Sequence, residues 1–507
     1  MSLRRCFAAA GLVLAMAVLL GAIQSLSAWM TRAQLQQDAA HTLETLRRGQ
    51  PLWRWQLRQP ADLIAGRAFG SARVTQDGDQ LRITSLDGSP YDLGLPLAQP
   101  IDLAHWPLLH LHIESSAPGQ LGLIWQANNQ STCLNADAAK LSTGVQNLTI
   151  DLRQWHPDGA CSSPGVTQLL RLRPQLPAGS WLRLGMAELR AATAPSIPDA
   201  HDVGSSFTLA NDPAEAQAQI AAWGKNSHPP AVPWVRLPSE APAETLLALR
   251  DRLRPLWPAA LILPASATLS ESVRQPLPAW IGWACCGGYL LLLGLFALRK
   301  SITIKRSPSG KPWLDLVLIL AAPLWLIAGL QWGLHLSVPG VIAFAAALVY
   351  ALHSEWRQRP WSWQWLGRRG SDWLWPLALL PVAAGLCLVF GHHWVWPGLR
   401  HVLTYLAWAC LQQWLMLVVV QRRLQQMRLA PMAQMLVIAS LFALLHTPNG
   451  ALMQLCLLAE LWWAWCFLRS RCLLPIALAH ASCALLVESG LTGSLVRSLE
   501  ISARFFL

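Results

Sequence analysis

The last third of the chain carries a small set of polar residues inside otherwise apolar segments. They are the paired glutamines Gln412 and Gln413, the histidines His446 and His480, and the carboxylate Glu460. An ionisable side chain at the centre of a membrane helix costs roughly 2.5–3.5 kcal/mol on insertion scales, and it normally faces a protein-lined cavity rather than lipid. A carboxylate in such a cavity can act as general base on water, with an imidazole as its partner. These residues are therefore candidates for a buried catalytic site.

Two of these segments carry a recognisable pattern. One reads Phe-Ala-Leu-Leu-His from Phe442 to His446 and is followed by Thr-Pro-Asn449, and the other reads Leu-Pro-Ile-Ala-Leu-Ala-His and ends at His480. Together with the glutamine pair one helix earlier, they resemble the three motifs of the CAAX-protease and bacteriocin-processing enzyme family. That family comprises intramembrane endopeptidases related to the type II CAAX prenyl proteases. Its usual motifs are Glu-Glu-x-x-x-Arg, Phe-x-x-x-His and His-x-x-x-Asn, and the resemblance covers residues 373–489.

The chain departs from the family pattern in its first and third motifs. Gln412 and Gln413 stand where the family has its two glutamates, Leu417 where it has arginine, and Ala484 where it has asparagine. In the family a glutamate acts as general base on water, while a histidine and the asparagine stabilise the oxyanion. Glutamine cannot take a proton from water, so the inherited base is missing.

Three interpretations of the site follow. In the first, the protein is an active peptidase whose catalytic residues are His446, His480 and, as the replacement base, Glu460. In the second, it is a catalytically inactive relative that holds a substrate or partner helix by hydrogen bonds worth about 0.6–2 kcal/mol each. In the third, the polar groups only join helices together. The resemblance favours the first, with a substrate site lined by Gln412, Gln413, Phe442 and Asn449.

The sequence predicts no metal and no cofactor at this site. Two histidines are too few for catalytic zinc, which usually takes three protein ligands. No His-Glu-x-x-His spacing occurs in the chain.

The composition is typical of a polytopic membrane protein. Hydrophobic residues make up 53% of the chain and charged residues 13%, and the mean hydropathy is +0.32. The apolar run from Cys6 to Trp29 can cross the ~30 Å hydrocarbon core, and its weak small-residue exit favours an uncleaved anchor over a signal peptide. With eight further runs the sequence predicts nine spans, the later ones near 280–298, 313–333, 338–353, 373–391, 401–420, 431–447, 450–468 and 472–489.

The basic residues predict the orientation of these spans. They concentrate in alternate connections, at Arg4 and Arg5, from Arg299 to Lys311, from Arg357 to Arg369, from Arg422 to Arg428, and at Arg469 and Arg471. Basic connections lie in the cytoplasm. The sequence therefore predicts a bacterial cytoplasmic (inner) membrane protein with a cytoplasmic N-terminus and a large periplasmic domain. The net charge of +12 is a topology signal, and no nucleic-acid partner is expected.

The segment 51–192 predicts an all-β sandwich or jelly roll. Its short stretches alternate between apolar and polar residues and are separated by turn pairs such as Asp77-Gly78. The spacing resembles galactose-binding-like jelly rolls that often bind carbohydrate. Trp125, Trp155 and Trp181 are candidates for stacking on a sugar, although places in the core are the stronger expectation. For His110 and His112, on one face of their strand, a solvated surface is expected rather than a metal site.

Cys133 and Cys161 share this extracytoplasmic segment, and the other nine of the eleven cysteines lie in predicted spans. An oxidising compartment permits a disulfide. The sequence therefore predicts a Cys133–Cys161 bridge, which would contribute roughly 3–4 kcal/mol on the chain-entropy model.

The predicted protein is a polytopic α-helical membrane protein with a β-sandwich after its first helix. Its function is predicted to be that of an intramembrane endopeptidase acting on a membrane-associated protein or peptide within the lipid bilayer. The alternative is an inactive relative, or an envelope-polysaccharide-binding membrane protein that acts as scaffold or sensor. The predicted parts are an anchor at 1–29, a spacer at 30–50, the sandwich at 51–192, a small α/β segment at 200–265, scaffold helices at 279–372, the protease-like bundle at 373–489 and a tail at 490–507.

Overall fold

The computed structural model divides the chain into two compact units. One comprises Met1–Gln34, Ala241–Ala248 and Gln275–Leu507, and the other comprises Leu35–Glu240 and Leu249–Arg274. The residues that the structure describes are 3–48, 53–97, 101–103, 106–127, 132–154, 166–192, 206–223, 232–257, 259–265, 267–268, 278–302, 311–330, 337–357, 362–391 and 397–506.

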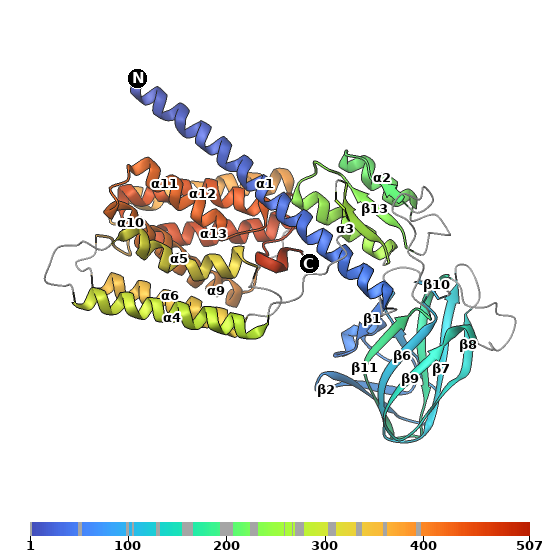
Figure 1. Cartoon of the computed structure of the whole chain (residues 1–507). Helices are drawn as coiled ribbons and strands as arrows, with labels where there is room; N and C mark the ends of the chain where they lie inside the picture. Colours follow the sequence, from blue (N-terminus) through green and yellow to red (C-terminus); the bar gives the residue numbers. More distant parts are fainter. Residues whose placement is uncertain are drawn as a thin grey trace. The chain divides into compact units, whose positions relative to one another are not determined.

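The first unit is a bundle of apolar helices (Figure 1). Within the described part of the chain, seven helices are long and apolar enough to cross a membrane, while α5 and α11 are apolar but shorter. Each of the nine predicted spans contains a helix, and the seven long apolar helices fit a multi-pass membrane protein. The helices are α1 (Leu3–Arg47), α4 (Ala279–Ile302), α5 (Pro312–Ala328), α6 (Val338–Trp356), α7 (Gly370–Leu377), α8 (Leu379–Phe390), α9 (Leu399–Gln413), α10 (Gln421–Gln426), α11 (Pro431–Leu444), α12 (Gly450–Ser470) and α13 (Leu474–Leu491).

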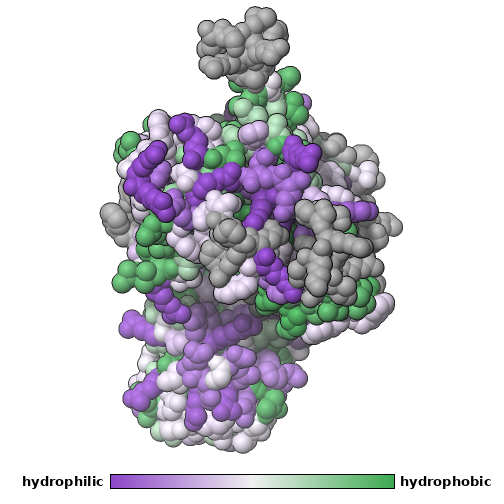
Figure 2. Space-filling view, turned by 90° about the vertical axis from the view of Figure 1, so that its left-hand side faces the viewer, coloured by the Kyte–Doolittle hydropathy of each residue, from purple (hydrophilic) through white to green (hydrophobic). Residues whose placement is uncertain are grey.

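The interior of the bundle lies around the four helices that carry the predicted site. Met416, Phe442, Phe467 and Ile476 are all at most 1% exposed and belong to one apolar cluster. Large apolar side chains such as Leu388 remain exposed on the sides of the bundle, as expected of a lipid-facing surface. Figure 2 looks at the end of the bundle that lies on the left in Figure 1, and hydrophilic residues gather on that end.

Helix α1 is longer than the predicted anchor. The sequence predicts a separate amphipathic helix in the spacer at 30–50, but the helix continues without a break from Leu3 to Arg47. No glycine or proline occurs between Gly21 and Arg47, so nothing in the sequence stops the helix. In the second unit, its buried residues Ala39, Leu43 and Leu46 join an apolar core.

The larger part of the second unit is a β-sandwich, as the sequence predicts. One antiparallel sheet has the order β2-β3-β11-β6-β9 with β1 beside β11, and the other has the order β4-β10-β7-β8 with β5 beside β10. The strands are β1 (Trp53–Gln56), β2 (Ala72–Asp77), β3 (Gln80–Ser85), β4 (Leu93–Leu95), β5 (Ile101–Asp102), β6 (Leu108–Ser115), β7 (Gly119–Ala127), β8 (Cys133–Leu141), β9 (Gly144–Asp151), β10 (Val166–Gln175) and β11 (Trp181–Arg190).

Alternation along the strands fills the space between the two sheets. In β6, Leu109, Leu111 and Ile113 are buried, whereas His110 and His112 lie on the outer face, where they contact Thr149 and Asn147 of β9. This matches the solvated surface expected for the two histidines.

Two of the three candidate carbohydrate-stacking tryptophans, Trp125 and Trp181, are covered by other groups in this sandwich. Trp125 is 1% exposed, which places it in the core. The Trp181 ring is covered by the guanidinium groups of Arg82 and Arg183, at 4.8 and 4.7 Å from its centroid. Trp155 lies outside the described residues.

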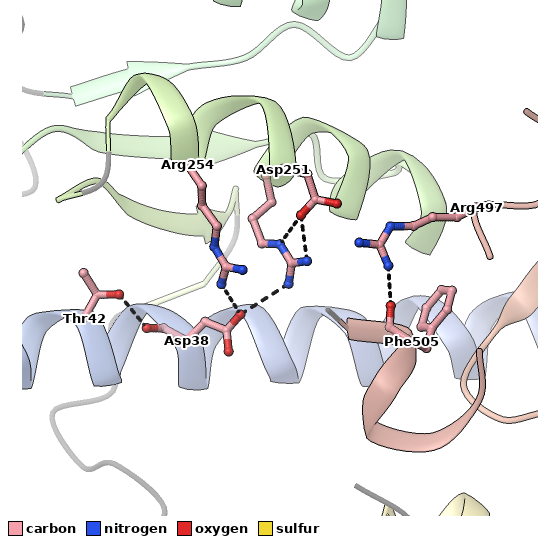
Figure 3. A network of polar contacts seen from close by, with 7 residues as sticks. Asp38, Thr42, Asp251, Arg254, Arg497 and Phe505 are labelled. Carbon is pink, nitrogen blue, oxygen red and sulfur yellow. Dashed lines mark hydrogen bonds and ion pairs between the residues drawn. The ribbon is translucent and has the colours of Figure 1, made fainter. Parts of the chain in front are cut away.

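The segment after the sandwich forms a small α/β layer. Three parallel strands, β12 (Ser206–Thr208), β13 (Trp234–Leu237) and β14 (Leu261–Pro264), alternate with α2 (Pro213–Trp223) and α3 (Ala243–Leu256). Within the second unit, Asp38 of α1 binds the guanidinium groups of Arg250 and Arg254 on α3, at 3.4 and 2.8 Å (Figure 3). Burial, with the charge of Arg254 as a smaller cause, lowers the pKa of Arg250. These ion pairs tie α1 to α3.

The predicted disulfide stays a prediction. Cys133 is buried at the start of β8 and is not among the free thiols. Its predicted partner Cys161 lies outside the described residues.

Candidate functional site

Four helices of the bundle carry the predicted site residues. Gln412 and Gln413 end α9, His446 lies two residues beyond α11, Glu460 is in the middle of α12, and His480 is in the first half of α13. The chain leaves the α-helical pattern directly after the glutamines, since Trp414–Val420 forms a π-helix. Such wide turns are rare and occur frequently at functional positions.

Gln413 joins two of the predicted catalytic residues. Its Nε2 donates to Glu460 Oε2 at 2.8 Å and lies 3.2 Å from His480 Nδ1. The amide nitrogen, which can only donate, therefore faces both Glu460 and His480. The same nitrogen therefore donates to His480 Nδ1, which leaves the proton of the neutral imidazole on Nε2.

His446 has the opposite tautomer. Its Nδ1 lies 2.8 Å from the carbonyl oxygen of Phe442, one turn earlier. A carbonyl oxygen only accepts hydrogen bonds, so Nδ1 carries the proton. The Nε2 of the neutral imidazole then has a free lone pair. The two neutral imidazoles thus differ at Nε2, which has a free lone pair in His446 and carries the proton in His480.

The Phe442 ring lies between the two imidazoles. Its centroid is 4.9 Å from that of His446 and 5.5 Å from that of His480, the latter edge-to-face. On another side, His480 packs against Trp463 at 5.2 Å. Phe442 and Trp463 are at most 2% exposed. The buried rings of Phe442 and Trp463 thus restrict the orientation of the His480 imidazole.

One cavity of about 470 Å³ connects these groups. Gln412, Phe442, His446 and His480 line it, together with Ala484, which stands at the family's asparagine position. This volume is typical of a ligand site. Gln413 and Glu460, both fully buried, are not among its lining residues, so they lie behind the wall and contact the cavity through His480.

The comparison with protein families agrees with this geometry. Residues 394–486 match the model of the Rce1-like family, described as type II CAAX prenyl endopeptidase Rce1-like. This part of the chain is CAAX-protease-like. The matched residues run from the beginning of α9 to α13 and contain all three predicted motifs.

Comparisons with curated proteins and with solved structures assign no function to this chain. A search of the curated proteins found no match. Among solved structures, a mutant of CBM29-2, from a study of ligand recognition by family 29 carbohydrate binding modules, covers 27% of this chain and 83% of its own, with 7% identity and a TM-score of 0.20. A second mutant of that module, complexed with cellulohexaose, covers 27% and 90%, also with 7% identity and a TM-score of 0.20. Such low scores support no conclusion about this chain.

Asn449, predicted to line the CAAX-protease-like site, lies elsewhere. Its Oδ1 accepts from the backbone N–H of Leu452 at 3.2 Å and so caps α12. Its Nδ2 donates to the carbonyl oxygens of Ser498, at 2.6 Å, and Glu500, at 3.2 Å. Asn449 is fully buried and is not a lining residue of the cavity. It fixes the turn that follows His446.

The C-terminal strap, residues 497–506, closes one side of the cavity. Leu499, Glu500, Ile501 and Arg504 line the cavity. The strap is attached to the turn after His446 by the Ser502 N–H, which donates to the Thr447 carbonyl oxygen at 2.7 Å. Arg497 folds it back on itself by donating to the Phe505 carbonyl oxygen (Figure 3). No motif in the tail predicts this role.

The bundle also contains a buried ion pair that the sequence analysis missed. Arg423 of α10 is fully buried and binds Glu355 of α6, which is 3% exposed. Arg422 binds the same carboxylate at 2.9 Å, and Ser354 accepts from Arg423 Nη2 at 2.6 Å. Both arginines belong to a connection that the sequence treats as solvent-facing. Within the described ranges, no group of three or more His, Cys, Asp or Glu residues could hold a metal ion.

Proposed function

We propose that the protein is an intramembrane endopeptidase that hydrolyses a peptide bond in a membrane-associated protein or peptide. The observation that carries this proposal is the shared cavity, into which two histidines of opposite tautomer face. The Rce1-like match over the same helices supports it. The distribution of basic residues further supports a bacterial cytoplasmic membrane, with a cytoplasmic N-terminus and a periplasmic sandwich.

His446 is the general base in this proposal. Its Nδ1–H is held by the Phe442 carbonyl, and its Nε2 lone pair is free to take a proton from a water molecule in the cavity. The water oxygen attacks the carbonyl carbon of the substrate, and the carbonyl π electrons move to its oxygen. When the tetrahedral intermediate collapses, the C–N bond breaks and the His446 imidazolium returns the proton to the leaving nitrogen. General-base help of this kind is worth about 10²–10⁴-fold in rate.

His480 stabilises the oxyanion. Gln413 donates to its Nδ1, so its Nε2–H is available as a donor toward the cavity. One such donor is worth about 10²–10³-fold in rate. In the family the asparagine shares this role, and Ala484 leaves it to His480 alone. The Gln412 amide, which also lines the cavity, would contact the substrate.

Glu460 and Gln413 are positioning residues in this proposal. Glu460 Oε2 accepts from Gln413, which holds the amide nitrogen toward His480. Because Glu460 lies behind the cavity wall, it reaches a water molecule only through the other two side chains. This role differs from that of the replacement base predicted from the sequence, and a Glu460→Gln variant distinguishes the two. The amide retains an acceptor for Gln413, so the rate falls by less than about tenfold if Glu460 positions and by about 10²–10⁴-fold if it is the base.

The walls of the cavity indicate the kind of substrate. They are mostly apolar, and α5 and α6 contribute to them, with Leu326 and Phe344 among the lining residues. An apolar segment of a membrane protein can enter a cavity with such walls, because few polar side chains of the wall then lose a hydrogen-bond partner. The predicted scaffold helices therefore form part of the proposed substrate site.

The test is a comparison of membrane-protein N-termini by mass spectrometry in cells that lack the protein. The cells are complemented with the native chain, with His446→Ala/His480→Ala, or with the matched control His353→Ala, which changes an exposed histidine of α6. New N-termini that appear with the native chain and the control, but not with the double variant, would support the peptidase. At equal abundance, identical N-termini from all strains would contradict it.

That contradicting outcome would favour the second candidate, an inactive relative that holds a partner helix. The replacement of the family's acidic pair by Gln412 and Gln413 is the observation that favours it. Amides can bind a backbone or a polar side chain of a partner helix without chemistry. Cross-linking from a photoreactive residue at position 412 would then recover an intact partner, whereas a peptidase would release it cleaved.

A further inference from the structure

A second, smaller cavity lies away from the histidines, where α7 begins and α12 ends. Its volume is about 160 Å³. Two arginines, two serines and two tryptophans contribute to its lining, namely Arg369, Ser371, Trp375, Trp465, Arg469 and Ser470. These residues come from two segments about one hundred positions apart in the chain, so the fold brings them together.

Backbone hydrogen bonds join the two chain segments that carry the lining residues. The Gln364 N–H donates to the Arg471 carbonyl oxygen at 2.9 Å, and the Leu473 N–H donates to the Gln364 carbonyl oxygen at 3.0 Å. The Leu474 N–H donates to the Trp365 carbonyl oxygen, also at 3.0 Å. These bonds fix the stretch before α7 to the link between α12 and α13. The two arginines are therefore presented by a defined backbone.

The acidic residue that lines this cavity is held by backbone donors. Asp372 also lines it, but its Oδ2 accepts from the backbone N–H groups of Arg368 and Arg369, both at 3.0 Å, and so caps α7. Neither Arg369 nor Arg469 forms an ion pair with a carboxylate in the part of the chain that the structure describes. The lining thus holds two arginines and one aspartate, so basic side chains outnumber acidic ones by one.

The aromatic residues place this cavity at the depth of the lipid headgroups. Trp375, Trp462 and Trp465 form one cluster, with ring centroids 4.9–6.0 Å apart. Tryptophan is enriched at the membrane–water interface. The Arg469 guanidinium lies 4.6 Å over the Trp465 ring, so its N–H groups at the edge remain available to a ligand.

We propose that this cavity binds a phosphate group, supplied by the headgroup of an anionic phospholipid. Arginine binds phosphate oxygens with two parallel N–H donors, and Arg369 and Arg469 provide two such forks within one small cavity. The Ser371 hydroxyl adds a neutral donor. Basic pockets between membrane helices bind anionic headgroups in this way. The neighbouring tryptophans would contact the glycerol and upper acyl chains.

The test uses the full-length protein in nanodiscs and does not depend on peptidase activity. Native mass spectrometry counts the lipids retained when nanodiscs of phosphatidylcholine are doped with phosphatidylglycerol. The variant is Arg369→Gln/Arg469→Gln, and the matched control is Arg368→Gln, a neighbouring exposed arginine that does not line the cavity. Both proteins are first compared by circular dichroism and gel filtration. If the double variant is not folded like the native chain, Ser371→Phe, which fills the cavity and leaves both arginines in place, replaces it.

The native chain and the control should retain phosphatidylglycerol in preference to phosphatidylcholine, and the variant should lose that preference about tenfold or more. Equal retention by variant and control would overturn the proposal. A second arm adds inorganic phosphate at millimolar concentration. If free phosphate displaces the lipid completely, the cavity is an anion site for a soluble phosphate, and the lipid assignment is wrong.

Discussion

Two buried polar clusters occur in the same helical bundle, and they differ in what surrounds them. The first joins Gln413, Glu460 and His480, and the second joins Arg423 and Glu355 with neighbouring polar groups. In the second, a guanidinium neutralises the carboxylate, and neither residue lines the large cavity. In the first, the carboxyl accepts from an amide, and the network ends on an imidazole that faces the cavity.

This difference separates a functional site from a structural one better than burial does. Burying a charge is costly in either place, and pairing it with the opposite charge recovers much of that cost. A cluster in which one polar group faces an open cavity is a candidate ligand site, because that group can still form a hydrogen bond to a ligand. In the proposed function the first cluster therefore takes part in the chemistry, and the second contributes to stability.

The largest expected effect comes from His446→Ala. The rate of cleavage should fall by about 10²–10⁴-fold because the proposed base is lost. Since His446 is only partly buried and faces the cavity, the variant should be as abundant as the native chain. Initial rates on a substrate found by the N-terminus comparison provide the measurement, with His353→Ala as control. A variant that keeps its rate would remove His446 from the mechanism.

Glu355→Ala tests the other side of the comparison. It leaves the Arg423 guanidinium buried without its carboxylate, which should cost about 3–5 kcal/mol of unfolding free energy. Denaturation of the purified protein in mixed micelles measures this loss, and activity per folded molecule should be unchanged. In Glu355→Leu/Arg423→Leu both charges are gone, so most of the stability should return. A stable Glu355→Ala variant with low activity would reverse our assignment.

Gln413→Glu asks whether the inherited acidic residue would improve this site. A carboxylate cannot donate to His480 Nδ1, so the imidazole should change tautomer and lose its Nε2–H toward the cavity. We expect the rate to fall by about 10²–10³-fold, as on removing an oxyanion donor. The control is Gln412→Asn, because Gln412 lies next to Gln413 but does not bind Glu460 or His480, and the variant keeps an amide there. Its rate of cleavage should fall by less than about tenfold. A rise in rate with Gln413→Glu would show that the family's glutamate mechanism still operates.

The smallest effect is expected at Asn449. Asn449→Ala removes the cap of α12 and should cost about 1 kcal/mol of stability, with little change in rate. Asn449→Asp keeps the acceptor for the Leu452 N–H but loses the donors to the strap. Comparing denaturation midpoints of the two variants separates capping from strap attachment. If both variants instead lost cleavage at full stability, Asn449 would act on the substrate as the sequence predicts.

The order of the motifs in the sequence was enough to predict that Gln412, His446 and His480 line one cavity. They lie at the end of α9, just beyond α11 and within α13. A polar side chain in an apolar membrane segment is expected to face the protein interior. The alternation from Leu109 to Ile113 likewise predicted a strand with one buried face. Such features depend on local periodicity, which one sequence contains.

Other features depend on partners that periodicity does not reveal. Arg423 lies in α10, in a basic stretch, and only its contact with Glu355 of α6 shows that it is buried. The tautomers of the two histidines depend on a carbonyl and an amide in contact with each ring. The strap reaches the cavity through hydrogen bonds to a turn about fifty residues earlier. None of these contacts has a spacing rule that a single sequence could supply.

The most direct test of the catalytic cavity is cleavage by the purified native chain in water enriched in ¹⁸O, using a substrate found by the N-terminus comparison. Our account predicts one ¹⁸O atom in the carboxylate of the new C-terminus, formed at a rate that drops sharply in His446→Ala and persists in the folded fraction of Glu355→Ala. Product formation without ¹⁸O, or equal rates from native chain and His446→Ala, would contradict hydrolysis by a water molecule that His446 activates.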